Sequence, residues 1–521
     1  MAIDRSVDSE ALAITERASG ESGARIHESV PWEGAKPAPM RVSAAVADPS
    51  VTPSVQHEPG ASCPAACCGA PALSCDAWAD LGRRIEWLDG RVKALAGHAG
   101  QLAALVADEI GKPLHEAAIA DVLALLAAMR WTAQRAPALL APRSAGWGSA
   151  MFLGRSIRTE RAPLGHVAII GTWNYPLQLL GVQIVHALIA GNRVTVKPSE
   201  RCPRTHAALL SLLGQGLPDG MLVWTEATRE AGERLLAGGR FDHVVFTGSS
   251  TVGRRVAQRC ALDLIPSTLE LSGSDSALVL ADADPVRAAR AVWNGFTMNA
   301  GQTCMAPRRA IVSRERAPAF LHELRVLAAS AAPVTLIDEA AARQVDAVVH
   351  EAVAAGGTPI TGVLESPRGR SMRPQVVVEA PPSCALSRGE HFGPALAVLV
   401  ERDDEAALER HRGYGQNLSA SIFTRGTPSR AMVEATGASI VTVNECVVAS
   451  GHPAVPLAGS GESGWGTSRG ADGLLAMTRP VTIALTRRGA DVPVGPPPSF
   501  LLRVLGWIMR ANLSRRRDPF T

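Results

Sequence analysis

A chain of 521 residues is longer than a single hydrophobic core usually supports, so two or three domains are expected. Apolar residues make up 46% of the chain, and 52 basic residues against 49 acidic ones leave a net charge of only +3. This near balance excludes a protein that grips nucleic acid through its overall charge, and we expect no nucleic acid partner.

Residues 1–72 are rich in Pro, Ser, Ala and Gly and have no sustained helical or strand period. A segment of this composition is typical of a disordered leader. It contains the CPAACC cluster, which lacks paired CxxC spacing and flanking histidines, so incidental thiols are favoured over a metal site and no metal is predicted. The amino-terminus has no apolar secretory run, so we expect reduced thiols and a cytoplasmic protein.

The first regular structure is predicted over 76–135, where apolar residues recur at spacings of three and four. This period is typical of amphipathic helices that bury one face. The folded part of the chain is therefore expected to begin with a helical segment.

Strands and helices then alternate. GHVAIIG at 165–171 predicts a buried strand, YPLQLLGVQIVHALIA at 175–190 a helix that ends before Gly191, and RVTVKPSE at 193–200 a second strand. FDHVVFTG at 241–248 predicts another strand, followed by a helix that starts with SSTVG, and STLEL and SALVL predict two more strands. This alternation predicts an α/β fold with a doubly wound parallel sheet, which commonly binds dinucleotides.

The turn GSSTVG at 248–253 joins a predicted strand to a predicted helix. Glycine allows close backbone approach there, and the helix start offers free N–H groups to a phosphate. The turn matches neither GxGxxG nor a Walker loop, so the residues alone leave phosphate binding and ordinary turn chemistry open.

Six motifs now occur together: GTWNYPLQLL, AGNRVTVKPSE, FTGSSTVG, LELSG, NAGQTCMAPRR and EHFGPALAV. In their order and spacing they resemble the aldehyde dehydrogenase superfamily over about residues 76–486, and most closely its class 3, fatty-aldehyde-type branch. The resemblance implies a Rossmann-type cofactor domain, an α/β catalytic domain and a small oligomerisation sheet. It also implies NAD(P)-dependent oxidation of an aldehyde to the carboxylic acid.

The same resemblance implies a division of the chain. An NAD(P)-binding domain is expected over 73–269, with a hairpin near 150–160 that belongs to the oligomerisation sheet. The catalytic domain is expected over 270–450. A return segment at 451–488 supplies the strand PVTIALTRR to that sheet, and 489–521 form a proline-rich hinge and a basic tail.

Three residues match the family's catalytic positions. Cys304 matches the nucleophile, whose thiolate adds to the aldehyde to form a thiohemiacetal and then a thioester. Asn174 matches the side-chain donor to the developing oxyanion, although an asparagine after a strand also commonly caps a helix. Glu270 matches the base that activates water against the thioester.

The LELSG motif departs from the family pattern in one position. Ser272 stands where Glu-Leu-Gly-Gly members have glycine, which puts the efficiency of the reaction in doubt more than its type. Coenzyme A-acylating members typically lack the glutamate, so Glu270 favours hydrolysis to a free acid. A coenzyme A-acylating enzyme and a catalytically silent relative stay open as alternatives.

The cofactor positions follow the same motifs, with NAD expected and NADP possible. A carboxylate near the adenosine ribose favours NAD because it repels a 2′-phosphate. Glu390 and Phe392 match residues that hold the nicotinamide ribose and ring. The full expected set of cofactor-binding residues is Trp173, Lys197, Glu200, Gly248, Ser249, Gly253, Glu390 and Phe392.

Other positions receive less specific predictions. Arg309 is interpreted as structural, and Lys112, in EIGKPLHEA, as remote from the chemistry. Trp293, Phe296, Met298, Tyr175 and Met305 could line an apolar aldehyde tunnel or simply form core.

The partners predicted are a small aldehyde and a second copy of the chain, as a homodimer with a tetramer as the alternative. FLLRVLGWIMRANLSRRR at 500–517 combines apolar residues with arginines. It is too short to span a bilayer but could lie at a membrane surface as an amphipathic helix, or pack on protein.

Overall fold

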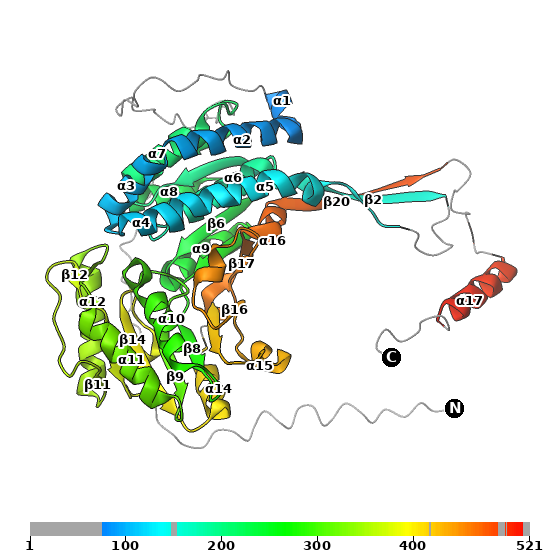
Figure 1. Cartoon of the computed structure of the whole chain (residues 1–521). Coiled ribbons are helices and arrows are strands. Elements are labelled where there is room, and N and C mark those ends of the chain that lie inside the picture. Colours follow the sequence, from blue (N-terminus) through cyan, green and yellow to red (C-terminus); the bar gives the residue numbers. More distant parts are fainter. Residues whose placement is uncertain (1–74, 147–153, 416–417, 488–494, 496–497, 514–521) are drawn as a thin grey trace, which may run out of the picture. The chain divides into compact units, whose positions relative to one another are not determined.

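The computed structural model describes residues 75–146, 154–415, 418–487, 495 and 498–513. The predicted leader and the tip of the predicted hairpin lie outside these residues. The described residues form three sheets of three or more strands, and helices surround the two larger sheets (Figure 1).

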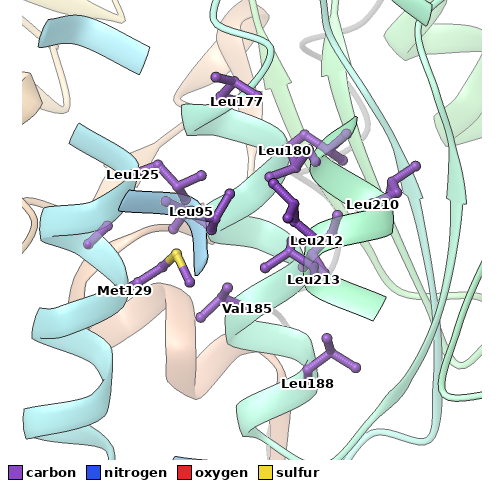
Figure 2. Close-up of a cluster of buried hydrophobic side chains, with 14 of the residues drawn as sticks. Leu95, Leu125, Met129, Leu177, Leu180, Val185, Leu188, Leu210, Leu212 and Leu213 are labelled. Carbon is purple, nitrogen blue, oxygen red and sulfur yellow. The ribbon is translucent and has the colours of Figure 1, made fainter. Parts of the chain in front are cut away.

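The predicted amino-terminal helical segment is confirmed. It contains α1 (Cys75–Ala79), α2 (Leu81–Gly97), α3 (Ala99–Ile110), α4 (Leu114–Glu116), the π-helix η1 (Ala117–Leu123) and α5 (Ala124–Leu140). The side chain of Asp80 caps α2 by accepting from the Arg83 N–H at 3.0 Å. Leu95, Leu125 and Met129 belong to one buried cluster with Leu180 and other leucines (Figure 2), and the cluster extends to strand residues such as Val167 and Val194, so these helices pack against a sheet.

A six-stranded sheet has the order β18-β7-β6-β3-β4-β5. All neighbours are parallel except β18, which pairs antiparallel with β7. The chain runs outward from β3 through β4 to β5 and then returns to β6 on the other side of β3, so the topological switch point lies between β3 and β6. The predicted strands and helices are confirmed as β3 (His166–Ile170), α6 (Gln178–Ile189), β4 (Arg193–Lys197), β6 (His243–Gly248), α9 (Ser250–Leu262) and β7 (Ser267–Leu271). The same layer also contains elements that the sequence analysis did not predict: α7 (Pro203–Gly214), β5 (Leu222–Trp224), α8 (Arg229–Gly238) and β18 (Gly464–Trp465).

Gly191 follows α6 with φ +96°, as expected of a residue just after a helix. A side chain there would also meet the Arg84 guanidinium.

A seven-stranded sheet has the order β11-β13-β14-β9-β8-β15-β16, with every pair parallel except β11 with β13. Its strands are β8 (Asp275–Val279), β9 (Pro307–Ser313), β11 (Thr358–Pro359), β13 (Gln375–Val378), β14 (Ala395–Glu401), β15 (Ser419–Phe423) and β16 (Ile440–Val443). Its helices are α10 (Pro285–Thr297), the short 3₁₀ turn η3 (Met298–Gly301), α11 (Ala317–Ser330), α12 (Glu339–Ala354), α13 (Ala385–Arg388), α14 (Asp404–Arg412) and α15 (Arg430–Ala435).

Short helices and strands also lie between the longer elements and in the return segment. They are β10 (Val334–Thr335), β12 (Ser371–Met372), η4 (Val448–Gly451), β17 (Leu457–Ala458), η5 (Gly461–Ser463), β19 (Thr467–Ser468) and α16 (Gly470–Ala476). Because β18 lies in this segment and pairs with β7, the return segment reaches the six-stranded sheet beside Glu270.

The third sheet has the order β1-β2-β20. Here β2 (Arg155–Pro163) pairs antiparallel with β20 (Thr478–Thr486) along its whole length, and β1 (Arg143–Ser144) lies on the other side of β2. The two long strands lie side by side in Figure 1. The predicted pairing of PVTIALTRR with the hairpin is confirmed, and β20 forms one edge of the sheet among the described residues.

Candidate active site

A cleft of about 550 Å³ brings together most of the residues singled out from the sequence. Its wall includes Trp173, Asn174, Gly248, Ser249, Glu270, Cys304, Glu390 and Phe392. Trp173 and Asn174 follow β3, Gly248 ends β6 and Ser249 follows it, so the cleft lies at the switch point where ligands of such sheets bind. Lys197, Glu200 and Gly253 do not line it.

Cys304 is placed by an irregular loop after η3. Asn299 and Ala300 both have left-handed backbone conformations, with φ of 50° and 53°. The Asn299 side chain donates to the carbonyls of Asn174 (2.9 Å) and Gln302 (3.1 Å), and its backbone N–H donates to Glu116 (2.7 Å). These bonds compensate for the strained backbone, and they place Cys304, a half-buried residue, in the wall of the cleft.

The thiol is not activated by its surroundings alone. Burial and, to a smaller extent, the carboxyl groups of Glu270 and Asp275 raise the pKa of Cys304 to about 12, although the Arg308 guanidinium opposes them. Since a thiolate is the reactive form, a proton acceptor or a newly arrived positive charge is required for attack.

Asn174 directs its amide nitrogen toward the cysteine loop. The Thr172 hydroxyl donates to Asn174 Oδ1 at 3.0 Å, which leaves Nδ2 to donate to the Gln302 carbonyl at 3.2 Å. The side chain is buried. An amide nitrogen carries two N–H groups, and Asn174 lines the cleft beside Cys304, which suits a donor to an oxyanion.

The sequence analysis interpreted Lys112 as remote from the chemistry, but the structure places it next to Asn174. Its ammonium group donates to the Asn174 carbonyl at 2.9 Å and lies 3.8 Å from the centre of the Tyr175 ring. It forms a completely buried ion pair with Asp121, whose other oxygen accepts from the Leu177 N–H. Burial lowers the pKa of Lys112 and raises that of Asp121. The pair thus fixes the backbone that carries Asn174.

Glu270 lies on β7 with its carboxyl group buried. It accepts from the hydroxyls of Thr247 and Ser468. Burial raises the pKa of Glu270 to about 8, although the nearby Arg469 partly lowers it. A carboxyl group with this pKa exchanges protons readily near neutral pH, which suits a general base. Sequence reasoning missed Ser468 and Arg469, which no recognised motif contained.

The predicted cofactor residues fall into three groups: the start of α9, the residues around Phe392, and the pair of Lys197 and Glu200. The first two groups line the cleft and the third does not. The start of α9 contributes Ser249, Ser250 and Thr251 to the cleft wall, and Ser249 caps the helix by accepting from the Val252 N–H at 3.4 Å. The first N–H groups of such a helix favour a phosphate. Gly253 lies inside α9, where a side chain would come within 2.4 Å of Leu271, so this glycine permits close packing of the helix on β7.

On the catalytic side, the Phe392 ring contacts Trp173 edge to face at 5.7 Å, and the exposed Glu390 pairs with Arg388. Away from the cleft wall, Lys197 donates to Glu200 at 2.6 Å. This arrangement suits a dinucleotide. The N–H groups at the start of α9 suit its phosphates, the Trp173 and Phe392 rings suit a flat nicotinamide ring, and the Glu200 carboxylate suits the hydroxyl groups of a ribose. The predicted contacts of these residues with cofactor stay predictions.

The candidate tunnel residues divide into two groups. Tyr175 and Met305 belong to a small apolar cluster that also includes Leu179, Leu418 and Leu457 and packs against Cys304. Trp293, Phe296 and Met298 instead pack in the core of the seven-stranded sheet.

The model of the aldehyde dehydrogenase family matches residues 41–483. The chain belongs to the aldehyde dehydrogenase family. It is 32% identical over 417 residues to 4,4′-diapolycopene aldehyde oxidase from Methylomonas, covering 78% of both chains. It is 28% identical over 423 residues to coniferyl aldehyde dehydrogenase from Pseudomonas, covering 78% of this chain and 87% of that one.

The fold agrees with this membership. A putative aldehyde dehydrogenase from Burkholderia cenocepacia superposes with a TM-score of 0.75 at 26% identity, covering 81% of this chain and 89% of that chain. The protein is therefore an NAD(P)-dependent aldehyde oxidoreductase with the aldehyde dehydrogenase fold. Within the described ranges, none of the helices combines the length and apolar character that a bilayer crossing requires.

Proposed function

We propose that the enzyme oxidises apolar aldehydes to free carboxylic acids through a thioester on Cys304. The Cys304 sulfur adds to the aldehyde carbonyl, and the Asn174 side chain and the Cys304 backbone N–H stabilise the oxygen that becomes negative. Bound NAD(P) supplies a hydride acceptor. Trp173, Phe392 and Glu390 hold its nicotinamide end, and the start of α9 holds its phosphates.

Hydrolysis completes the cycle. Glu270 removes a proton from water, the water oxygen bonds to the thioester carbon, and the carbon–sulfur bond breaks to release the acid and the Cys304 thiolate. The buried position of Glu270 in the wall of the same cleft as Cys304 is the observation that carries this proposal over transfer to coenzyme A. Purified enzyme with NAD and an aldehyde tests it: equal rates with and without added coenzyme A, and a free acid as product, are expected. Formation of acyl-coenzyme A would contradict it.

The apolar cluster beside Cys304 supports the substrate class. Leu179, Leu418 and Leu457 line the cleft at the nucleophile, and the relatives from Methylomonas and Cytobacillus firmus are named for diapolycopene aldehydes. A fatty-aldehyde-type preference fits the same surface. Each buried CH₂ contributes about 0.8 kcal/mol, so kcat/KM should rise about fourfold per methylene from acetaldehyde upward until the apolar wall ends. A flat profile from acetaldehyde to dodecanal would contradict the assignment.

We further infer a preference for NAD, with NADP accepted more weakly. The Glu200 carboxylate, paired with Lys197, would repel a 2′-phosphate. Replacement of Glu200 by glutamine should raise kcat/KM for NADP relative to NAD, and an unchanged ratio would count against this role.

The assembly proposed is a homodimer with three functional parts in each chain. The six-stranded sheet binds cofactor, the seven-stranded sheet carries the nucleophile, and β20 offers an open strand edge for pairing with a second copy. Light scattering of the purified enzyme would distinguish a dimer from a tetramer or a monomer.

We propose that the enzyme is cytoplasmic and that its carboxy-terminal tail binds weakly to the surface of a membrane. In α17 (Ser499–Leu513) the side chains of Phe500, Leu502, Val504 and Trp507 are between 45% and 68% exposed. Arg503 and Arg510 are exposed on the same helix. Exposed apolar and basic side chains on one helix favour an anionic lipid interface, where long apolar aldehydes also accumulate. The predicted apolar face included further residues whose side chains lie outside the described set.

A further inference from the structure

Two consecutive arginines on β9 are completely buried. Arg308 and Arg309 both have 0% exposure, and no carboxylate lies within ion-pair distance of either in the described part of the chain. Backbone carbonyl and serine oxygens accept from the Nε and both terminal nitrogens of Arg309 and from the two terminal nitrogens of Arg308, whereas the Arg308 Nε–H has no acceptor among the described residues. Burying a guanidinium without an ion pair is costly, so two such groups in sequence require a reason.

The two arginines contact different parts of the molecule. Arg309 donates to Ser274, Ser276 and Ser387 and stacks 3.8 Å from the centre of the Tyr414 ring. Ser274 directly precedes β8, Ser276 lies in it, Ser387 lies in α13, and Tyr414 follows α14. Arg309 therefore stabilises the frame of the seven-stranded sheet, which agrees with its predicted structural role.

Arg308 contacts the active-site loops instead. One of its terminal nitrogens donates to the carbonyls of Gly301 (2.8 Å) and Gly393 (3.4 Å), and the other donates to the carbonyl of Thr303 (2.8 Å). Gly301 and Thr303 lie just before Cys304, and Gly393 directly follows Phe392. The guanidinium carbon also lies 5.3 Å from the centre of the Phe392 ring.

The two loops that Arg308 joins are in close backbone contact. Gly301 has φ +71°, and a side chain there would come within 2.3 Å of the Gly393 backbone. A side chain on Gly389, in the same loop, would meet Arg308 itself at 3.0 Å. Gly301 thus permits the close approach of the two loops, and Gly389 leaves room for Arg308.

We propose that Arg308 is a positioning residue that ties the Cys304 loop to the Phe392 loop and provides the positive charge that favours the Cys304 thiolate. This proposal rests on the proposed role of Cys304. The planar guanidinium group of Arg308 donates to three carbonyls at once, which a lysine cannot reproduce. The nucleophile and the ring assigned to the nicotinamide are thereby kept at a constant separation.

The charge argument follows from the groups around the thiol. Glu270 on β7 and Asp275 on β8 disfavour the thiolate, whereas Arg308 on β9 favours it. Arg469 and Tyr175 also interact electrostatically with the sulfur from their own segments. Burial lowers the pKa of Arg308 to about 10, so the group remains charged at neutral pH.

Three variants of the full-length enzyme test the proposal: Arg308→Met, Arg308→Lys and the matched control Arg309→Lys. Alkylation of Cys304 by iodoacetamide is followed against pH by mass spectrometry of the Cys304 peptide, because the chain has nine cysteines. The rate of alkylation at a fixed pH of about 8 should fall by about tenfold in Arg308→Met, because an opposite charge has been removed and the thiolate fraction falls tenfold for each unit by which the pKa rises. The rate should change little in Arg308→Lys and not in Arg309→Lys.

Steady-state kinetics supply the second readout. Arg308→Lys keeps the charge but loses the carbonyl fork, so kcat should fall and KM for the cofactor should rise, while Arg309→Lys should mainly lower the melting temperature. If Arg308→Met does not fold, the comparison of the two lysine variants decides. Identical kinetics and pH profiles of Arg308→Lys and Arg309→Lys would overturn the proposal and leave Arg308 a structural residue.

Failure of the underlying function gives a different result. If Cys304 is not the nucleophile, Cys304→Ala retains turnover whatever the Arg308 variants do. Loss of turnover in Cys304→Ala together with an unchanged rate of alkylation in Arg308→Met would reject only the role of Arg308.

Discussion

Replacement of Glu270 by glutamine separates the two halves of the reaction. The substitution keeps the shape of the side chain but removes the proton acceptor. Water is needed only after the hydride has left the substrate, so the first turnover should proceed and the thioester should accumulate. General base catalysis contributes about 10²- to 10⁴-fold, and steady turnover should fall by that order.

The pH dependence follows from the raised pKa of Glu270, about 8. The carboxylate is the active form, so the hydrolysis rate increases as pH rises through this value. About one tenth of the groups are ionised at pH 7 and about nine tenths at pH 9, which predicts a roughly tenfold increase in deacylation across that range. In Glu270→Gln this increase should disappear.

Rapid mixing with NAD and an aldehyde, followed by absorbance of reduced cofactor, measures both phases. A burst close to one equivalent per active site, then slow turnover, is the expected result for Glu270→Gln. The exposed Glu434, paired with Arg430 on α15, provides the control: Glu434→Gln should behave as the unmodified enzyme. Loss of the burst itself would refute the reasoning and show that Glu270 mainly activates Cys304.

Four further predictions follow from the site and the tail. Cys304→Ala should abolish turnover but leave NAD binding intact by fluorescence titration; clear residual turnover would reject the nucleophile. Asn174→Ala should lower kcat by about 10²- to 10³-fold, since one oxyanion donor is lost, and unchanged kcat in the folded variant would reject this role. Lys112→Met should destabilise the enzyme by about 3–5 kcal/mol in chemical denaturation, because Asp121 is left buried and unpaired, and a wild-type midpoint would contradict this. Deletion after Pro498 should preserve activity on short aldehydes but reduce co-sedimentation with anionic vesicles at low salt. Equal pelleting of both forms, or loss of the oligomer, would show that the tail packs on protein.

Local sequence patterns predicted much of the fold. The apolar run of β3, the helix length of α6 and the glycine after it are all set by neighbouring residues, and the structure confirms them. The long pairing of β2 with β20 followed from the family resemblance, since nothing local specifies a partner more than three hundred residues away. The predicted domain boundary at residue 269 falls inside β7, because one continuous strand carries Glu270 from one sheet toward the other.

The sequence by itself determined the chemical groups of this enzyme, their order, and the elements on which most of them lie. Only the tertiary structure decided their environment. Ser468 reaches Glu270 across 198 positions of sequence, and Lys112 supports Asn174 across 62. Proton affinity depends on burial and on charges that approach through space. The raised pKa values of Cys304 and Glu270, and the carbonyls around Arg308, therefore exist only when the two large sheets and the return segment close around the same cleft.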